Sequence, residues 1–291
     1  MPIRMSRLPT HAEITNFLET FLPPQVNAND VAFLYHTPRH PAYSPTEVKT
    51  ARVIFSITPT PGFYTSLNEQ GVRFPPSFDA HLTVGWNVAL AKRLGVQVED
   101  AVCIQGYKED PERKIGLVAK FEQAVSLDSI VQMIQREFAG VGEVFRNDAS
   151  NDKEDDNVVH DDVSHEHPIK ILAVMNAFHA EEVDRVLEAA RAANWTHGEV
   201  TGNQILYLTG AAREHGLEAT KQANTPVVCV GHRACEEWGI RYLAEETRKR
   251  WPDIEVIQVL EEEEPRPKRV KLQSGEVAGS QPAKSGNEVH G

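Results

Sequence analysis

The stretch TPVVCVGHRACEEWGIRYL, residues 225–243, carries the strongest local signals in the chain. Its apolar run 227–230 predicts a buried strand, and Gly231 permits a tight turn into a helix that runs to Arg250. His232 and Glu236 stand four residues apart at the start of this helix, so their side chains share one face. They lie beyond the carboxyl end of a strand, where α/β sheets usually bind ligands. The pair therefore predicts either a divalent-metal site or an ordinary surface or capping pair.

Strands and helices alternate on both sides of an acidic stretch, which predicts an α/β fold of mixed or parallel sheets covered by helices. In the second α/β segment (168–260), strands are predicted at 169–174, 204–208, 227–230 and 254–260, with one helix whose apolar face is Val183, Val186, Leu187 and Ala190. In the first (1–147), short strands are predicted at 32–35 and 53–58.

The first segment also predicts three helices. A capping box at 10–13 starts one that ends before Pro23. Asn87 is expected to cap a helix ended by Gly95, and a third helix has the apolar face Ile130, Val131, Ile134 and Phe138.

Composition limits the class of protein. With 291 residues, 41% of them hydrophobic, the chain can bury a real core in one large or two ordinary domains. No apolar run approaches the roughly 18–20 residues that cross a bilayer, and residues 1–15 do not resemble a secretory signal. Three cysteines without a C-x-x-C motif suit a reducing compartment. We expect a soluble, cytoplasmic protein without membrane association.

Charge is concentrated outside these segments. Residues 148–167 carry eight acids and one lysine and predict a disordered linker, although its histidines 160, 165 and 167 are also a metal-binding possibility. Glu261–Glu264 carry four more acids, whereas 265–291 have five bases and two acids. Without these stretches the net charge of −12 falls to about −4, which gives no basic surface for direct nucleic-acid binding.

The tail, 261–291, is expected to be disordered and contains PRPKRVKL at 265–272. Four bases within six residues, among them Lys268 and Lys271, resemble a monopartite nuclear import signal. Solvated tail charge is the other interpretation, so the predicted location is cytoplasmic with possible nuclear import.

Two further side-chain types could carry chemistry. Trp86 and Trp238 could stack on a purine, but their helical positions favour core packing. Cys235 lies at a helix N-terminus, where a thiol pKa can be lowered, although a packed small residue is the better interpretation.

The motif Gly-His-x-x-x-Glu at 231–236, between an apolar strand and a helix, resembles the Nif-three-like family, also called GTP cyclohydrolase I type 2-like proteins. Thr209-Gly210 followed by His215, Phe78-Asp79, and Leu34-Tyr-His-Thr-Pro38 are similar to other family motifs in the family's order. The resemblance covers about residues 10–260 without the linker.

This resemblance implies two α/β lobes with a two-metal centre in the cleft between them, often in ring-shaped hexamers. By position, the implied metal ligands are His36, Asp79, His232 and Glu236. The sequence departs from the family at Thr37 and Pro75, where histidine ligands are expected, and at Ala211, where a glutamate is expected.

The implied activity is that of a divalent-metal-dependent, cyclohydrolase-like hydrolase of unknown substrate, and the implied assembly is a homo-oligomer. Four ligands can hold one ion with an open position, while two ions normally need more, so one ion is favoured over two or none. His215 is a candidate acid/base group, or else an exposed histidine in a loop. The alternative is a non-catalytic regulatory protein with a degraded metal site, which would bind protein partners through its linker or tail.

Overall fold

The computed structural model describes residues 8–21, 43–57, 84–107, 110–146, 168–195 and 202–260. The elements in chain order are α1 (His11–Glu19), β1 (Arg52–Ser56), α3 (Val84–Arg93), β2 (Val102–Tyr107), β3 (Asp110–Val125), α4 (Leu127–Glu137), β4 (Glu143–Phe145), β5 (Ile169–Met175), α5 (Ala180–Ala192), η2 (Gly202–Gln204), β6 (Ile205–Thr209), α6 (Glu214–Gln222), β7 (Val227–Cys229), α7 (His232–Arg250) and β8 (Glu255–Val259). The predicted α/β class is confirmed.

A mixed six-stranded sheet in the order β2-β3-β5-β6-β7-β4 forms the larger part of the fold. Its centre, β5-β6-β7, is parallel, while β3 pairs with β5, β2 with β3, and β4 with β7 in antiparallel fashion. The sequences of the parallel strands are continuous apolar runs because both faces of the sheet are covered.

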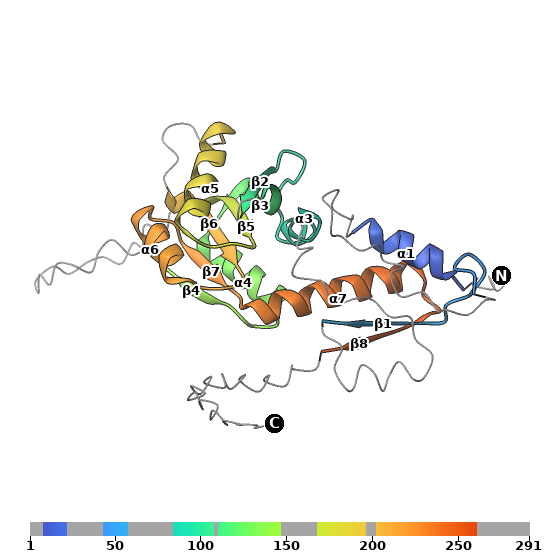
Figure 1. The fold of residues 1–291 in the computed structure, drawn as a ribbon. Helices are drawn as coiled ribbons and strands as arrows, with labels where there is room; N and C mark the ends of the chain where they lie inside the picture. Colours follow the sequence, from blue (N-terminus) through green and yellow to red (C-terminus); the bar gives the residue numbers. More distant parts are fainter. Residues whose placement is uncertain are drawn as a thin grey trace, which may run out of the picture. The chain divides into compact units, whose positions relative to one another are not determined.

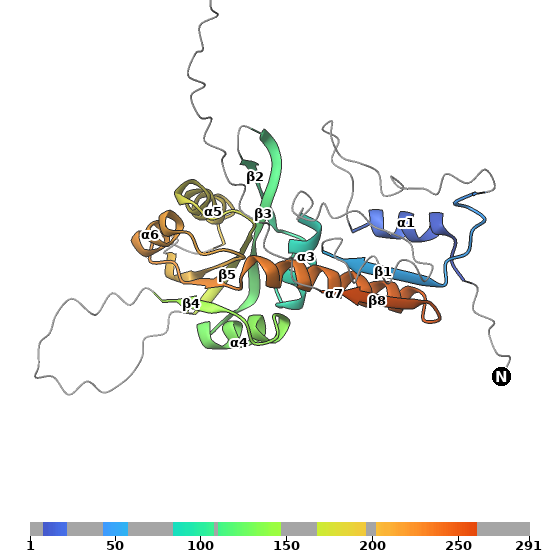
Figure 2. The same ribbon diagram turned by 60° about the horizontal axis from the view of Figure 1, so that its bottom comes forward.

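Helices cover both faces of this sheet (Figures 1 and 2). Successive residues of a strand point to opposite faces. Leu172 and Val174 of β5 thus join the core under α3, α4 and α7, whereas Ile171 and Ala173 join the core under α5 and α6. The predicted apolar face of α5, which includes Val183 and Val186, packs there.

A separate two-stranded parallel sheet pairs β1 with β8, next to α7 (Figure 1). Helix α1 and the turn after it pack against α7. Phe21, two residues past α1, contacts Tyr242 of α7, with ring centroids 5.8 Å apart. Phe17 of α1 contacts Trp251, the residue that follows α7, with ring centroids 5.1 Å apart. The capping box of α1 is confirmed, because Thr10 and Glu13 each accept a hydrogen bond from the other's backbone N–H.

The two α/β segments predicted from the sequence do not each close a sheet of their own. Strand β3 of the first segment pairs with β5 of the second, β4 pairs with β7, and β1 pairs with β8. The physical reason is that β3 has buried residues on both faces and is paired along both edges, by β2 and by β5.

Several local predictions need correction. Helix α3 begins at Val84, so Asn87 does not cap it; the buried Asn87 amide instead donates to the carbonyl oxygen of Val174, at 3.2 Å. The sequence prediction did not include β2, β3, β4 or α6.

Other predictions lie outside the described residues: the strand 32–35, the linker 148–167 and the tail 261–291. Within the described part of the chain, no helix has the length and apolar character needed to span a membrane.

Candidate functional site

Three successive loops meet at one edge of the six-stranded sheet. Strands β5, β6 and β7 are parallel, so the residues that follow them emerge together: Asn176 after β5, Gly210 after β6, and His232 just past the end of β7. These residues line a pocket of about 200 Å³ that α3 and α7 help to enclose. The pocket lies beyond the carboxyl ends of parallel strands, where open α/β sheets bind ligands.

Two glycines allow the strand ends and α7 to approach. Gly231, the N-cap of α7, has φ +87°, a backbone conformation that favours glycine. At Gly210, a β-carbon would lie 3.0 Å from Cys235 Sγ and 3.6 Å from His232 Cα. The backbone after β6 therefore packs closely against the first turn of α7, which fixes His232 at the pocket.

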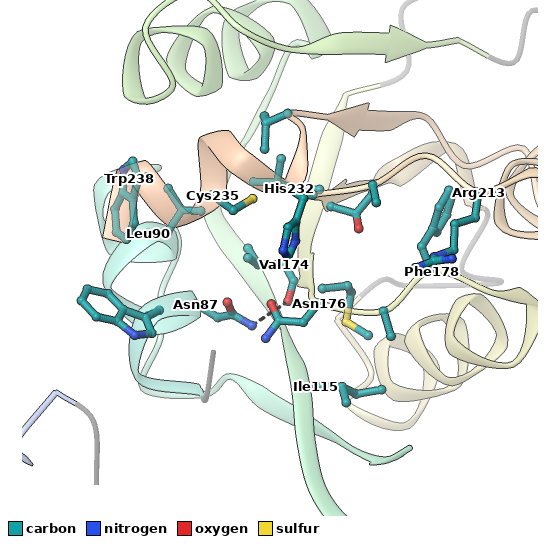
Figure 3. A pocket seen from close by; sticks show the side chains of 18 of the residues that line it. Asn87, Leu90, Ile115, Val174, Asn176, Phe178, Arg213, His232, Cys235 and Trp238 are labelled. Carbon is teal, nitrogen blue, oxygen red and sulfur yellow. Dashed lines mark hydrogen bonds between the residues drawn. The ribbon is translucent and has the colours of Figure 1, made fainter. Parts of the chain in front are cut away.

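His232 and Glu236 form the pair that their spacing predicted. His232 Nε2 lies 3.3 Å from Glu236 Oε1; the imidazole is 60% exposed and the carboxylate only 13%. Figure 3 shows the His232 ring projecting into the pocket. Two donors bound to one tetrahedral ion at about 2.0–2.2 Å lie roughly 3.3–3.5 Å apart. The separation thus admits a shared cation, and it equally fits a direct contact between the two groups.

The polar side chains that line the pocket are mostly basic groups and carboxamides. The pocket is lined by Lys114 and Arg213, by the amide side chains Asn87 and Asn176, and by Thr209. Its described lining residues include no carboxylate. Asn87 is held by its hydrogen bond to Val174, drawn as a dashed line in Figure 3. Such a lining favours an anionic or carbonyl-bearing ligand.

Aromatic side chains line the pocket on both sides. Figure 3 places Trp238 and Leu90 on one side of the pocket and Phe178 and Arg213 on the other. Trp86 and Trp238 are only 2% and 5% exposed and pack edge to face, with centroids 6.2 Å apart. The preference for core packing is confirmed, although both rings also border the pocket.

Cys235 is not an activated thiol. Burial, together with the neighbouring Cys229 and Glu236, raises the pKa of Cys235 to about 12. A thiol with such a pKa is almost wholly protonated at neutral pH and is a poor nucleophile. This agrees with the interpretation of Cys235 as a packed small residue.

The predicted site residues fall into three groups. His232 lines the pocket and is paired with Glu236, which is not among the lining residues, whereas His36 and Asp79, with Thr37 and Pro75, lie outside the described residues. Ala211 lines the pocket. Within the described ranges, no group of three or more His, Cys, Asp or Glu side chains is placed to hold a metal ion.

His215 lies in helix α6 rather than in a loop, and it borders a second hollow between α5 and α6 instead of the pocket that contains His232. Sequence reasoning missed four polar residues that line the first pocket: Asn87, Lys114, Asn176 and Arg213. Only Asn176 carried a usable signal, because it lies two residues after the predicted strand 169–174.

No protein-family model and no curated protein sequence matches the chain. Among solved structures, the chain is similar to reduced HcgD from Methanocaldococcus jannaschii, with 14% identity, a TM-score of 0.51, and coverage of 87% of this chain and 98% of that one. It is also similar to the hypothetical protein SA1388 from Staphylococcus aureus, with 10% identity, a TM-score of 0.50, and coverage of 87% and 97%.

A Bacillus cereus protein described as related to NIF3 also matches, at 9% identity and a TM-score of 0.43, with coverage of 89% of this chain and 99% of that one. The chain has a Nif-three-like fold, so the resemblance predicted from the motifs is confirmed at the level of the fold. Identities this low show the fold and leave the activity to be established.

Proposed function

We propose that this protein is a divalent-metal-binding, hydrolase-like protein whose ion is held at the start of α7. The observation that supports this best is the His232–Glu236 pair, 3.3 Å apart, whose imidazole lines a pocket beyond three parallel strand ends. A neutral imidazole and a carboxylate are ordinary ligands for Zn, Mn, Fe or Ni. His36 and Asp79 are the two further ligands proposed from the sequence motifs.

A divalent ion, when bound by these residues, would lower the pKa of a bound water and so supply hydroxide at neutral pH. Substrate binding and the exclusion of water are roles for the protein's own side chains. Lys114 and Arg213 would hold an anionic group of the substrate, and Asn87, fixed by Val174, would donate to or accept from a polar group beside it. Trp86 and Trp238 would exclude water from one side of the pocket.

Metal analysis of the purified full chain tests this proposal. After incubation with Zn²⁺ or Mn²⁺ and desalting, we expect about one ion per chain. His232→Ala and Glu236→Gln should each lower the affinity by about tenfold or more, because they remove direct ligands. The matched control is Glu237→Gln, since Glu237 is the adjacent carboxylate and is paired instead with Arg233, at 2.9 Å.

Equal and low metal content in all four proteins would contradict the proposal. It would favour the alternative of a non-catalytic regulatory protein on the same fold. That alternative is supported by the sequence departures at Thr37, Pro75 and Ala211 and by the basic motif at 268–271.

A further inference from the structure

A second hollow, separate from the proposed metal site, lies between α5 and α6. It has a volume of about 580 Å³ and is lined by Tyr107 at the end of β2, by residues of the first turns of α5, and by residues of α6. Among the side chains that line it are Glu181, Glu182, Glu218, Arg185, His179 and His215. Three carboxylates face one guanidinium, so the hollow carries a net negative charge.

Glu182 is the decisive residue. It is only 3% exposed, yet within the described residues its Oε2 atom has no hydrogen-bond partner. Leaving a buried charged acceptor without a partner is costly, and the positive end of the α5 dipole offsets only part of that cost. A buried carboxylate that lines a hollow and lacks a donor is suited to accept one from a ligand.

The one guanidinium in the hollow is already engaged. Arg185 Nη1 donates to the backbone oxygens of Gln105 and Gly106, at 3.0 and 2.5 Å, and Nη2 lies 3.4 Å from Glu181. Glu218 accepts from Gln222 at 2.9 Å. Arg185 therefore neutralises Glu181 and ties α5 to β2, which leaves the charge of Glu182 uncompensated by a hydrogen-bonded partner among the described residues.

We infer that this hollow binds an organic cation, an alkylammonium or guanidinium group, whose N–H donors reach Glu182. Within the described residues no metal-ligand cluster occurs, so an organic cation suits the hollow better than a metal ion. An N–H donor on a charged group makes a strong hydrogen bond to a carboxylate, which would offset the cost of burying Glu182. The group could belong to a free amine or to an arginine side chain of a peptide.

To test this inference, the full chain is titrated with each of two probes, and binding is monitored through the amide signals in NMR spectra. The probes are agmatine, a small free cation, and a blocked tripeptide with one central arginine. We expect saturable shifts at the start of α5 and in α6, and Glu182→Gln should weaken binding by about tenfold or more. Glu188→Gln, which removes the same charge from an exposed position of α5 outside the hollow, should leave the affinity within about twofold.

The two probes separate the sources. Binding of agmatine alone assigns the site to free amines, binding of the peptide alone assigns it to an arginine of a partner, and binding of both shows recognition of the head group itself. If neither saturates, if Glu182→Gln binds as wild type does, or if inorganic phosphate binds there instead, the inference is overturned. If the circular dichroism spectrum shows that Glu182→Gln does not fold, Glu218→Gln replaces it as the test variant. Glu218 is exposed, so we expect a smaller loss of affinity.

Discussion

His11, the first residue of α1, is a buried histidine whose protonation opposes folding. It is 8% exposed, and its Nδ1 contacts the hydroxyl of Tyr43. Burial lowers the pKa of His11 below its usual value of 6.5. The positive end of the helix dipole acts in the same direction, because a charged imidazole at a helix N-terminus is unfavourable.

This predicts a loss of stability in mild acid. A lowered folded-state pKa means that the unfolded chain takes up the proton first, so the free energy of unfolding falls as the pH drops below about 6.5. His11→Gln should show a smaller fall between pH 7.5 and pH 5.5, measured by urea unfolding. A His11 ring that titrates in NMR at or above its ordinary pKa would contradict this account.

At the scale of elements, Arg93 connects three helices on one face of the sheet. It is the last residue of α3, and its guanidinium lies 3.3 Å from Glu137 of α4 and 2.5 Å from Glu245 of α7. It also lies over the rings of Trp238 and Tyr242, at 5.6 and 5.1 Å from their centroids. Glu137 in turn accepts from Trp238 Nε1, at 2.9 Å.

Arg93→Lys should therefore destabilise the protein although it conserves the charge. A single ammonium cannot reach both carboxylates and cover two rings, so we expect the free energy of unfolding to fall by about 1 kcal/mol. Urea midpoints measure the effect.

The control for Arg93→Lys is Arg146→Lys, because Arg146 pairs with Asp128 on the surface, with side chains 43% and 55% exposed. There we expect a change of roughly a few tenths of a kcal/mol at most. Equal effects at the two positions would show that the bridging geometry of Arg93 contributes nothing to stability.

At the scale of the whole molecule, the shared sheet makes the two halves of the sequence dependent on each other. Without 168–260, β3 keeps only β2 as a neighbour, and β1 and β4 lose their partners β8 and β7. The cores beneath α3 and α4 lose the apolar side chains of β5, β6 and α7.

We predict that residues 1–147 alone do not unfold cooperatively, as followed by circular dichroism during urea titration. Co-expression with 168–260 should restore a folded complex, because the described strands that pair with one another all lie within the two fragments. A sharp transition of the isolated 1–147 fragment would show that the first segment folds by itself.

The sequence by itself determined the elements whose signals are local. The capping box of α1, the apolar run of β5, and the glycine that starts α7 each act within a few residues, and each lies where it was predicted. The pairing of His232 with Glu236 was also local, because helical geometry alone places residues four apart on one face.

Only the tertiary structure decided which strands pair and which side chains meet. The 16-residue β3 lacked a clear local pattern, because its middle part, 115–119, is buried on both faces, whereas its start pairs with β2 alone. Lys114, Asn176 and Arg213 reach the pocket from strand and loop positions 37 or more residues apart. Glu182 lines a hollow with residues of α6 only because α5 and α6 cover the same sheet face. Such neighbours are set by long-range burial and strand pairing, which no short stretch of sequence encodes.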